Sequence, residues 1–154
     1  MTHFVKFWTP LILWMLFIFV ASTDLMSSEH TSRFLIPFLL WLKPDMSFAT
    51  IDSIDFLVRK IAHLMEYAIF AGLLWRAIHH GTSLRARFRV EATIVFFFAT
   101  LYAASDEFHQ SFVYSRGPSP RDVMIDGGGV LLGLAASWLV ARKRPSESTF
   151  VAIE

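Results

Sequence analysis

The chain contains no cysteine. This absence excludes disulfide bonds, thiol nucleophiles and thiolate metal sites. Charged residues are also scarce, at 18% of 154 residues, and the formal net charge is only +1. A protein this close to neutral lacks the strongly basic surface that the phosphates of a nucleic acid require. We therefore predict that this protein binds no nucleic acid.

Apolar residues dominate the sequence instead. Hydrophobic residues make up 55% of the chain, and they include 16 Phe and 5 Trp. They occur in long blocks, whereas a soluble amphipathic helix would interrupt them at regular intervals. We predict an all-α polytopic membrane protein that forms a single domain over residues 1–154.

Four apolar blocks are expected to span a membrane, at about residues 7–24, 61–79, 90–109 and 122–141. Each approaches the ~20 residues that cross a hydrocarbon core of ~30 Å. The first block has an alternative interpretation as a secretory signal, because the small residues Ala21 and Ser22 follow its apolar part at residues 7–20. The polar tail after residue 145 is expected to be loose.

The connection between the first two blocks is expected to lie at the membrane surface. Residues 34–42 are apolar but too short to span, and Pro37 interrupts them, so an interfacial or re-entrant segment is predicted. Four apolar residues then follow with helical spacing: Phe48, Ile51, Ile54 and Val58. They predict an amphipathic helix that lies on the surface and leads into the second span.

Basic residues predict the orientation. Lys6, the loop at residues 85–89 and the cluster at residues 142–144 fall on one side of a four-span protein. By the positive-inside rule this side is cytoplasmic, so both termini are expected in the cytoplasm.

Ionisable residues are expected to meet near the opposite, extracytoplasmic boundary. Residues 90–104 cover only about 22 Å at 1.5 Å per residue, so the third span must continue to about His109. By the same rise, His63, Glu66, Asp106 and Asp126 lie about 3–8 Å below that boundary. Ionisable groups at such depth cost roughly 2.5–3.5 kcal/mol each on insertion scales, so they are usually paired and functional.

We assign acid–base roles to four of these residues: His63, Glu66, Asp106 and His109. Seven further residues are expected to contact a ligand: Tyr67, Glu107, Gln110, Arg116, Arg121, Asp122 and Asp126. Asp106, His109 and Glu107 on one helix, opposite His63 and Glu66, could hold a divalent metal such as zinc or iron. The alternative is a network of hydrogen bonds that only locks the helices together.

Arg116 and Arg121 flank the start of the fourth span. Free N–H groups at a helix N-terminus favour an anion, and guanidinium groups match phosphate in bidentate geometry. A membrane lipid is therefore the expected partner, through the head group of a phospholipid or a polyprenyl phosphate. The alternative is ordinary interfacial anchoring, with capping by Ser119 and Asp122.

The polar motifs, in chain order, are Arg59-Lys60-x-x-His63-x-x-Glu66-Tyr67, Tyr102-x-x-Ser105-Asp106-Glu107-x-His109-Gln110-x-Phe112, Arg116, Arg121-Asp122-Val123 and Asp126-x-x-Gly129-x-x-x-Gly133. In these motifs the sequence resembles the VanZ-like family of small bacterial membrane proteins. The family is named for a protein linked to teicoplanin-type glycopeptide resistance. The resemblance implies a protein of the bacterial inner membrane with a cell-envelope role and an effect on glycopeptide susceptibility. It implies no reaction.

Three functions remain open at this point. The polar layer could belong to an enzyme that acts on an envelope lipid, to a protein that binds such a lipid without chemistry, or to an accessory protein in which it is structural. The sequence does not distinguish among these three functions. It does not determine the oligomeric state either.

Overall fold

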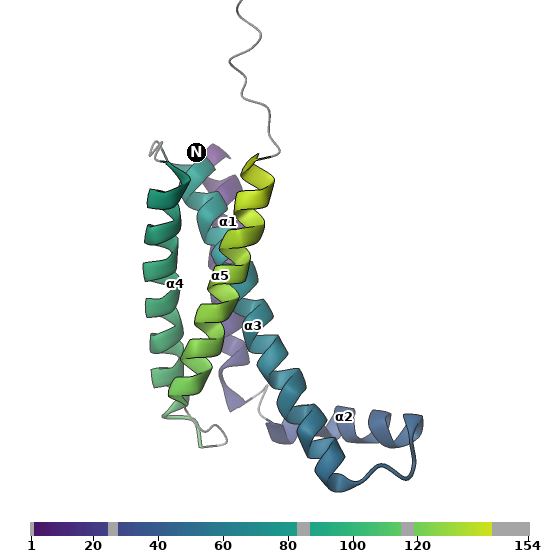
Figure 1. Cartoon of the computed structure of the whole chain (residues 1–154). Helices are drawn as coiled ribbons and strands as arrows, with labels where there is room; N and C mark the ends of the chain where they lie inside the picture. Colours follow the sequence, from purple (N-terminus) through teal and green to yellow (C-terminus); the bar gives the residue numbers. More distant parts are fainter. Residues whose placement is uncertain (1, 25–27, 83–86, 115–118, 143–154) are drawn as a thin grey trace, which may run out of the picture.

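A computed structural model describes residues 2–24, 28–82, 87–114 and 119–142 (Figure 1). These ranges contain five α-helices and no strand: α1 (Thr2–Ala21), α2 (Ser28–Leu42), α3 (Phe48–Gly81), α4 (Phe88–Gln110) and α5 (Pro120–Arg142). The helices α1, α3, α4 and α5 form a bundle, and α2 lies to one side of it. The prediction of an all-α protein is confirmed.

Among the described residues, four helices are long and apolar enough to cross a membrane, and the shorter α2 lies between the first two of them. The outer surface of the bundle is apolar as well: Leu13, Phe97 and Leu131 are each more than half exposed. In water such a surface would be an aggregation hazard, whereas in a bilayer it faces lipid. The prediction of four membrane spans is confirmed, and the chain is a multi-pass membrane protein.

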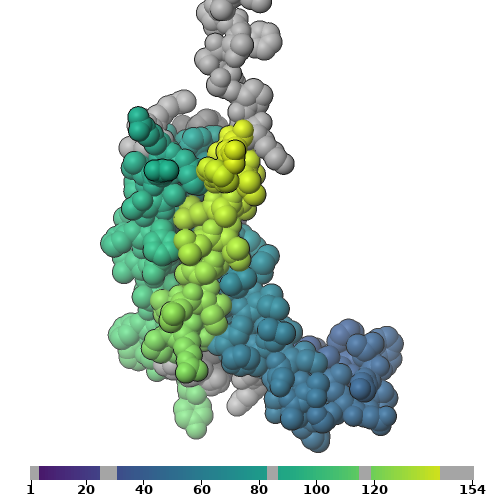
Figure 2. All heavy atoms as spheres, in the orientation of Figure 1, coloured from purple at the N-terminus to yellow at the C-terminus, as the bar shows by residue number. Residues whose placement is uncertain are grey.

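The helix α3 is longer than a membrane span requires. Its 34 residues correspond to about 51 Å at 1.5 Å per residue. The predicted amphipathic segment and the second span are therefore parts of one helix, with no break near residue 61. The reason is local, because no Gly or Pro lies between Phe48 and Gly72. The first part of α3 projects from the bundle together with α2 (Figure 1 and Figure 2).

The projecting helix α2 continues through Pro37, which bends or weakens a helix but does not end this one. It exposes Phe34, Phe38 and Trp41, which share one helical face, and it buries Leu39. An exposed aromatic face of this kind is typical of a helix that lies in a membrane interface.

The closest helix pair is α3 and α5. A Cβ atom placed on Gly133 would overlap the carbonyl oxygen of Ala68, and one on Gly129 would overlap that of Leu64. Two glycines four residues apart thus let the two backbones touch, as small residues do at membrane helix interfaces. This contact determines the height at which α5 lies beside α3.

Side chains join α1 to the rest of the bundle. The Tyr102 hydroxyl of α4 donates a hydrogen bond to the Met15 carbonyl at 2.9 Å, and the Trp14 indole donates one to the Glu66 carbonyl at 3.0 Å. Consecutive long helices run in opposite directions (Figure 1). The end of α1, the middle of α3, the end of α4 and the start of α5 therefore meet at one end of the bundle.

Candidate functional site

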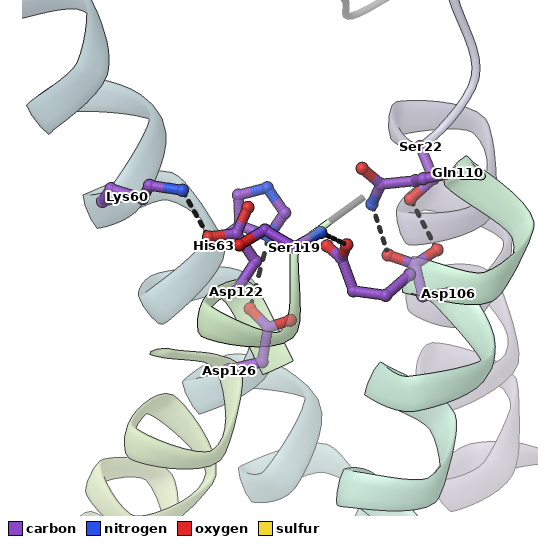
Figure 3. A network of polar contacts seen from close by, with 9 residues as sticks. Ser22, Lys60, His63, Asp106, Gln110, Ser119, Asp122 and Asp126 are labelled. Carbon is purple, nitrogen blue, oxygen red and sulfur yellow. Dashed lines mark hydrogen bonds and ion pairs between the residues drawn. The ribbon is translucent and has the colours of Figure 1, made fainter. Parts of the chain in front are cut away.

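The polar residues gather at this end, as Figure 3 shows. Four carboxyl groups, here called the acidic cluster, are at least 92% buried: Asp106 (6% exposed), Glu107 (6%), Asp122 (8%) and Asp126 (0%). Two of them belong to α4 and two to α5. Burial of four carboxyl groups is costly unless each finds donors or cations.

Two pairs connect α3 to α5. The ammonium group of Lys60 forms an ion pair with the Asp122 carboxylate. His63 Nδ1 lies 3.3 Å from Asp126 Oδ1. The spacings match, because Lys60 and His63 are one turn apart on α3, as are Asp122 and Asp126 on α5. Lys60 was not predicted as a site residue, although its place one turn before His63 was the available signal.

Glu107 faces the start of α5. Its Oε2 accepts a hydrogen bond from the backbone N–H of Ser119 at 2.9 Å. Ser119 also caps α5, since its hydroxyl oxygen accepts from the Arg121 N–H at 3.2 Å. The contact joins the end of α4 to the start of α5 across the loop between them.

Asp106 faces α1 instead. The Ser22 hydroxyl donates to Asp106 Oδ1 at 2.5 Å, and the Gln110 amide donates to Oδ2 at 3.1 Å. Neighbouring helical residues point about 100° apart, yet Asp106 and Glu107 are both buried. This is possible because α4 contacts α1 on one side and α5 on the other. Ser22, which follows α1 directly, was not assigned to the site from the sequence.

Four other predicted site residues lie in the described part of the chain around this cluster. The Tyr67 ring is fully buried, and the His109 ring stacks on Phe19 of α1 with ring centroids 4.7 Å apart. Glu66 is partly buried, and Arg121 is exposed at the start of α5. Arg116 lies outside the described residues, so its predicted phosphate contact stays a prediction.

Three residues could share a metal ion. One ligand atom each from His63, Glu107 and Asp126 lie within 4.8 Å of one another. From the sequence, a metal was expected at Asp106, His109 and Glu107, opposite His63 and Glu66. In the structure both Asp106 oxygens accept hydrogen bonds, and the His109 ring faces α1. The helix that supplies the additional carboxylate is α5, which the spacing within α4 could not indicate.

Unpaired polar atoms concentrate at the same end. Among the described residues, five buried side-chain nitrogen or oxygen atoms have no hydrogen-bond partner: Tyr67 Oη, Thr100 Oγ1, Glu107 Oε1, His109 Nδ1 and Asp126 Oδ2. All of these except Thr100 belong to residues that the sequence had assigned to the site. Buried unpaired groups are rare in proteins and usually indicate a bound ion, water or ligand, or a catalytic role.

One further buried carboxylate lies toward the other end of the bundle. Glu91 of α4 is 1% exposed, and it accepts hydrogen bonds from Trp75 Nε1 at 3.0 Å and from His79 Nδ1 at 3.0 Å. This contact between α3 and α4 was not predicted from the sequence. The signal was an acid in the first turn of an apolar helix, close in sequence to an aromatic residue and a histidine one turn apart.

The comparison with known families confirms what these motifs indicate. The family model described as VanZ/LLP1 matches residues 7–141. The chain belongs to the VanZ/LLP1 family. It is thus a VanZ-like membrane protein of the cell envelope, and the match includes most of α1 and all of α2 as well as the motifs from residue 59 on. No curated protein and no solved structure matches this VanZ-family chain.

Proposed function

We propose that the acidic cluster, with His63 and Lys60, is the functional site of this VanZ-family protein. The site binds or processes the head group of an anionic envelope lipid or lipid-linked precursor. It faces the extracytoplasmic side of the bacterial inner membrane, and its action alters glycopeptide susceptibility.

The concentration of unpaired buried atoms carries this proposal. A cluster that served only to hold helices together would satisfy its own members, because each unsatisfied buried group lowers stability. Here Glu107, Asp126 and Tyr67 each keep one atom without a partner, whereas both oxygens of the neighbouring Asp106 accept hydrogen bonds. Such atoms are available to a ligand.

A lipid is the natural ligand because the site lies at the end of a bundle with an apolar outer surface. Two cationic side chains lie at the rim, where a head group would arrive. The Lys60 side chain is 24% exposed, and Arg121 is exposed at the N-terminus of α5. Such cationic side chains favour a phosphate at this position.

The pair His63 and Asp126 supplies the chemistry that an enzyme would need. A histidine whose Nδ1 contacts a buried carboxylate is held in one orientation, and its other ring nitrogen can accept or donate a proton. Hydrolysis or transfer at a phosphate or ester bond would use such a group. Binding without chemistry would use the same residues as hydrogen-bond partners.

A second candidate function is a structural lock in an accessory protein. The contacts of Asp106 with Ser22 and Gln110 favour it, because they join α1 to α4 and leave both Asp106 oxygens bonded. The pair Lys60 and Asp122 joins α3 to α5 in the same way.

Substitution of His63 or Asp126 by asparagine is expected to abolish the effect on teicoplanin susceptibility. Asparagine approximates the size of either side chain but removes proton transfer and, at Asp126, the charge. The measurement is bacterial growth against teicoplanin, in cells whose tolerance depends on this protein, at matched protein levels. The control is Asp52→Asn, because Asp52 is exposed on the projecting part of α3.

Full tolerance with both His63→Asn and Asp126→Asn would show that the site is not needed and would overturn the proposal. Thermal unfolding of the purified variants separates the two candidate functions. A lock requires that tolerance decrease in step with stability, whereas a functional site loses tolerance in variants that stay folded.

A further inference from the structure

The acidic cluster holds more negative than positive charge. Four carboxyl groups are buried there, and the contacting side chains that can be cationic are Lys60, bound to Asp122, and His63, bound to Asp126. The Glu107 carboxylate receives one backbone N–H, and its Oε1 has no partner. Asp126 Oδ2, in a side chain with no exposed surface, has none either. A surplus of buried negative charge requires a cation or a proton.

We propose that His63, Glu107 and Asp126 bind a divalent transition-metal ion. Their ligand atoms already lie within 4.8 Å of one another, and they come from three different helices. One imidazole and two carboxylates suit zinc, iron or manganese, whereas calcium and magnesium favour oxygen ligands alone. Three protein ligands also leave a coordination position open, as in catalytic metal sites.

The neighbouring contacts hold these ligands in place. The Ser119 N–H fixes Glu107 through Oε2, and the glycine contact of α5 with α3 sets the height of Asp126 beside His63. Hydrogen-bonded neighbours of this kind orient metal ligands and raise affinity. A bound dication would also let an anionic head group approach a cluster of four carboxylates. Metal binding by these three residues does not depend on whether a lipid is the substrate.

Metal binding is tested on the full chain, purified in detergent, stripped with a chelator and incubated with Zn²⁺ or Mn²⁺. We expect about one metal ion per chain by mass spectrometry after desalting, as one three-ligand site predicts. The variants Glu107→Gln and Asp126→Asn are expected to lower the affinity at least ~10-fold, since even outer neighbours of a metal cost that much. The matched control is Asp106→Asn, which removes a similarly buried charge from a residue that is not one of the three proposed ligands.

The proposal would be overturned if the wild-type protein retained neither metal. It would also be overturned if Glu107→Gln and Asp126→Asn both retained as much metal as the wild type. Thermal unfolding gives a second readout that does not depend on activity. The metal should raise the unfolding temperature of the wild type and of Asp106→Asn only. If Asp126 is instead protonated, Asp126→Asn will match the wild type with and without metal, which also overturns the proposal.

A groove toward the opposite end of the bundle carries a second, independent inference. It has a volume of about 890 Å³ and runs between α3 and α5, with the first turns of α1 at one end. Gly72, Gly133 and Ala136 are among the small residues that line it. Most of its surface is apolar, and in a four-span protein it faces lipid.

Basic side chains cluster at one end of this groove. Around the Phe7 ring lie Lys6 Nζ at 5.5 Å and Arg76 Cζ at 4.9 Å from the centroid, and the His80 ring stacks on it at 5.3 Å. In the described parts of the chain, no carboxylate forms an ion pair with Lys6 or Arg76. A second apolar groove, of about 660 Å³ between α1, α3 and α4, is lined by no charged residue.

We infer that the α3–α5 groove binds an anionic phospholipid. Its acyl chain lies along the apolar part, and its phosphate contacts Lys6 and Arg76. Basic pockets between membrane helices recognise acidic head groups in this way. The uncharged groove on the other side is expected to accept acyl chains without preference for a head group.

The lipid site is tested by native mass spectrometry of the full chain with phosphatidylglycerol or phosphatidylcholine of identical acyl chains. We expect wild-type protein to retain phosphatidylglycerol preferentially and the double variant Lys6→Gln, Arg76→Gln to lose that preference. The control Arg33→Gln, Lys43→Gln removes two exposed charges elsewhere. Gly72→Leu should fill the groove and reduce retention with all charges present, since a Cβ there meets only Ser137 Oγ at 3.9 Å.

Equal retention of the two lipids by wild-type protein would overturn the lipid inference. An unchanged preference in the Lys6 and Arg76 double variant would overturn it too. Neither result bears on the acidic cluster, which lies at the other end of the bundle.

Discussion

Replacement of Gly133 by alanine is expected to destabilise the bundle by about 3 kcal/mol, at the upper end of overpacking costs. The added methyl group would overlap the Ala68 carbonyl oxygen, and Ala68 Cα would lie only 3.1 Å away. Backbone atoms cannot rotate aside as a side chain can, so α5 must move away from α3. The measurement is the free energy of unfolding in detergent micelles.

The control for Gly133→Ala is the same substitution at Gly127, where a Cβ meets nothing within 4 Å. Gly127→Ala should leave stability unchanged or raise it by up to about 1 kcal/mol, because alanine favours a helix over glycine. If the two variants prove equally stable, the close contact between α3 and α5 is wrong. A shifted α5 would also separate Asp126 from His63, so Gly133→Ala should impair the site as well.

Replacement of Asp106 by leucine is expected to destabilise the protein by about 2–4 kcal/mol, because two buried donors lose their acceptor. The donors are the Ser22 hydroxyl and the Gln110 amide, and both residues are 4% exposed. Unfolding measured as for Gly133 tests this expectation. Asp106→Asn keeps an acceptor for Ser22, so its loss should be clearly smaller.

A double-mutant cycle shows whether the unpaired hydroxyl causes the Asp106→Leu loss. Adding Ser22→Ala to Asp106→Leu removes one stranded donor and should recover part of the lost stability. In the wild-type background, Ser22→Ala should itself be destabilising, because it strands Asp106 Oδ1. If Asp106→Leu is as stable as the wild type, the contact does not join α1 to α4 as described.

These two predictions concern different ways of holding the same site. The glycine contact places α5 against α3 through backbone packing, and the Asp106 contacts join α4 to α1 through hydrogen bonds. The residues proposed to bind a ligand lie between these two attachments. A site built on rigid, packed helices can keep polar atoms unpaired, because the surrounding packing compensates for their cost.

Segment length and helical spacing predicted where α4 ends and which face of α5 carries its acids, but not how the side chains pair between helices. Segment length alone required α4 to continue to about His109, and the helix ends at Gln110. Helical spacing put Asp122 and Asp126 on one face of α5, and both are buried there. The expected amphipathic helix and second span proved to be one helix, because the absence of Gly and Pro favours continuity and a sequence pattern does not show where a membrane begins.

Pairing across helices could not be obtained from spacing within one helix. The helical periodicity of the sequence does not predict that Glu107 faces α5 while its neighbour Asp106 faces α1. The direction that each side chain faces depends on which helices lie on either side of α4. The contributions of Ser22 and Lys60 depend on the same arrangement. The contacts of Glu91 were not predicted because its partners, Trp75 and His79, belong to another helix.

By itself, the sequence determined a four-span helical membrane protein of VanZ type, with polar residues at one depth on three of its helices. The length of an apolar segment and the rise of a helix are local quantities, so they can be obtained from the amino-acid sequence alone. Only the tertiary structure decided that His63, Glu107 and Asp126 approach one another and that Asp106 is saturated by Ser22 and Gln110. These pairings depend on how closely α5 packs on α3. The rotation of each helix and its position along the bundle determine which side chains meet.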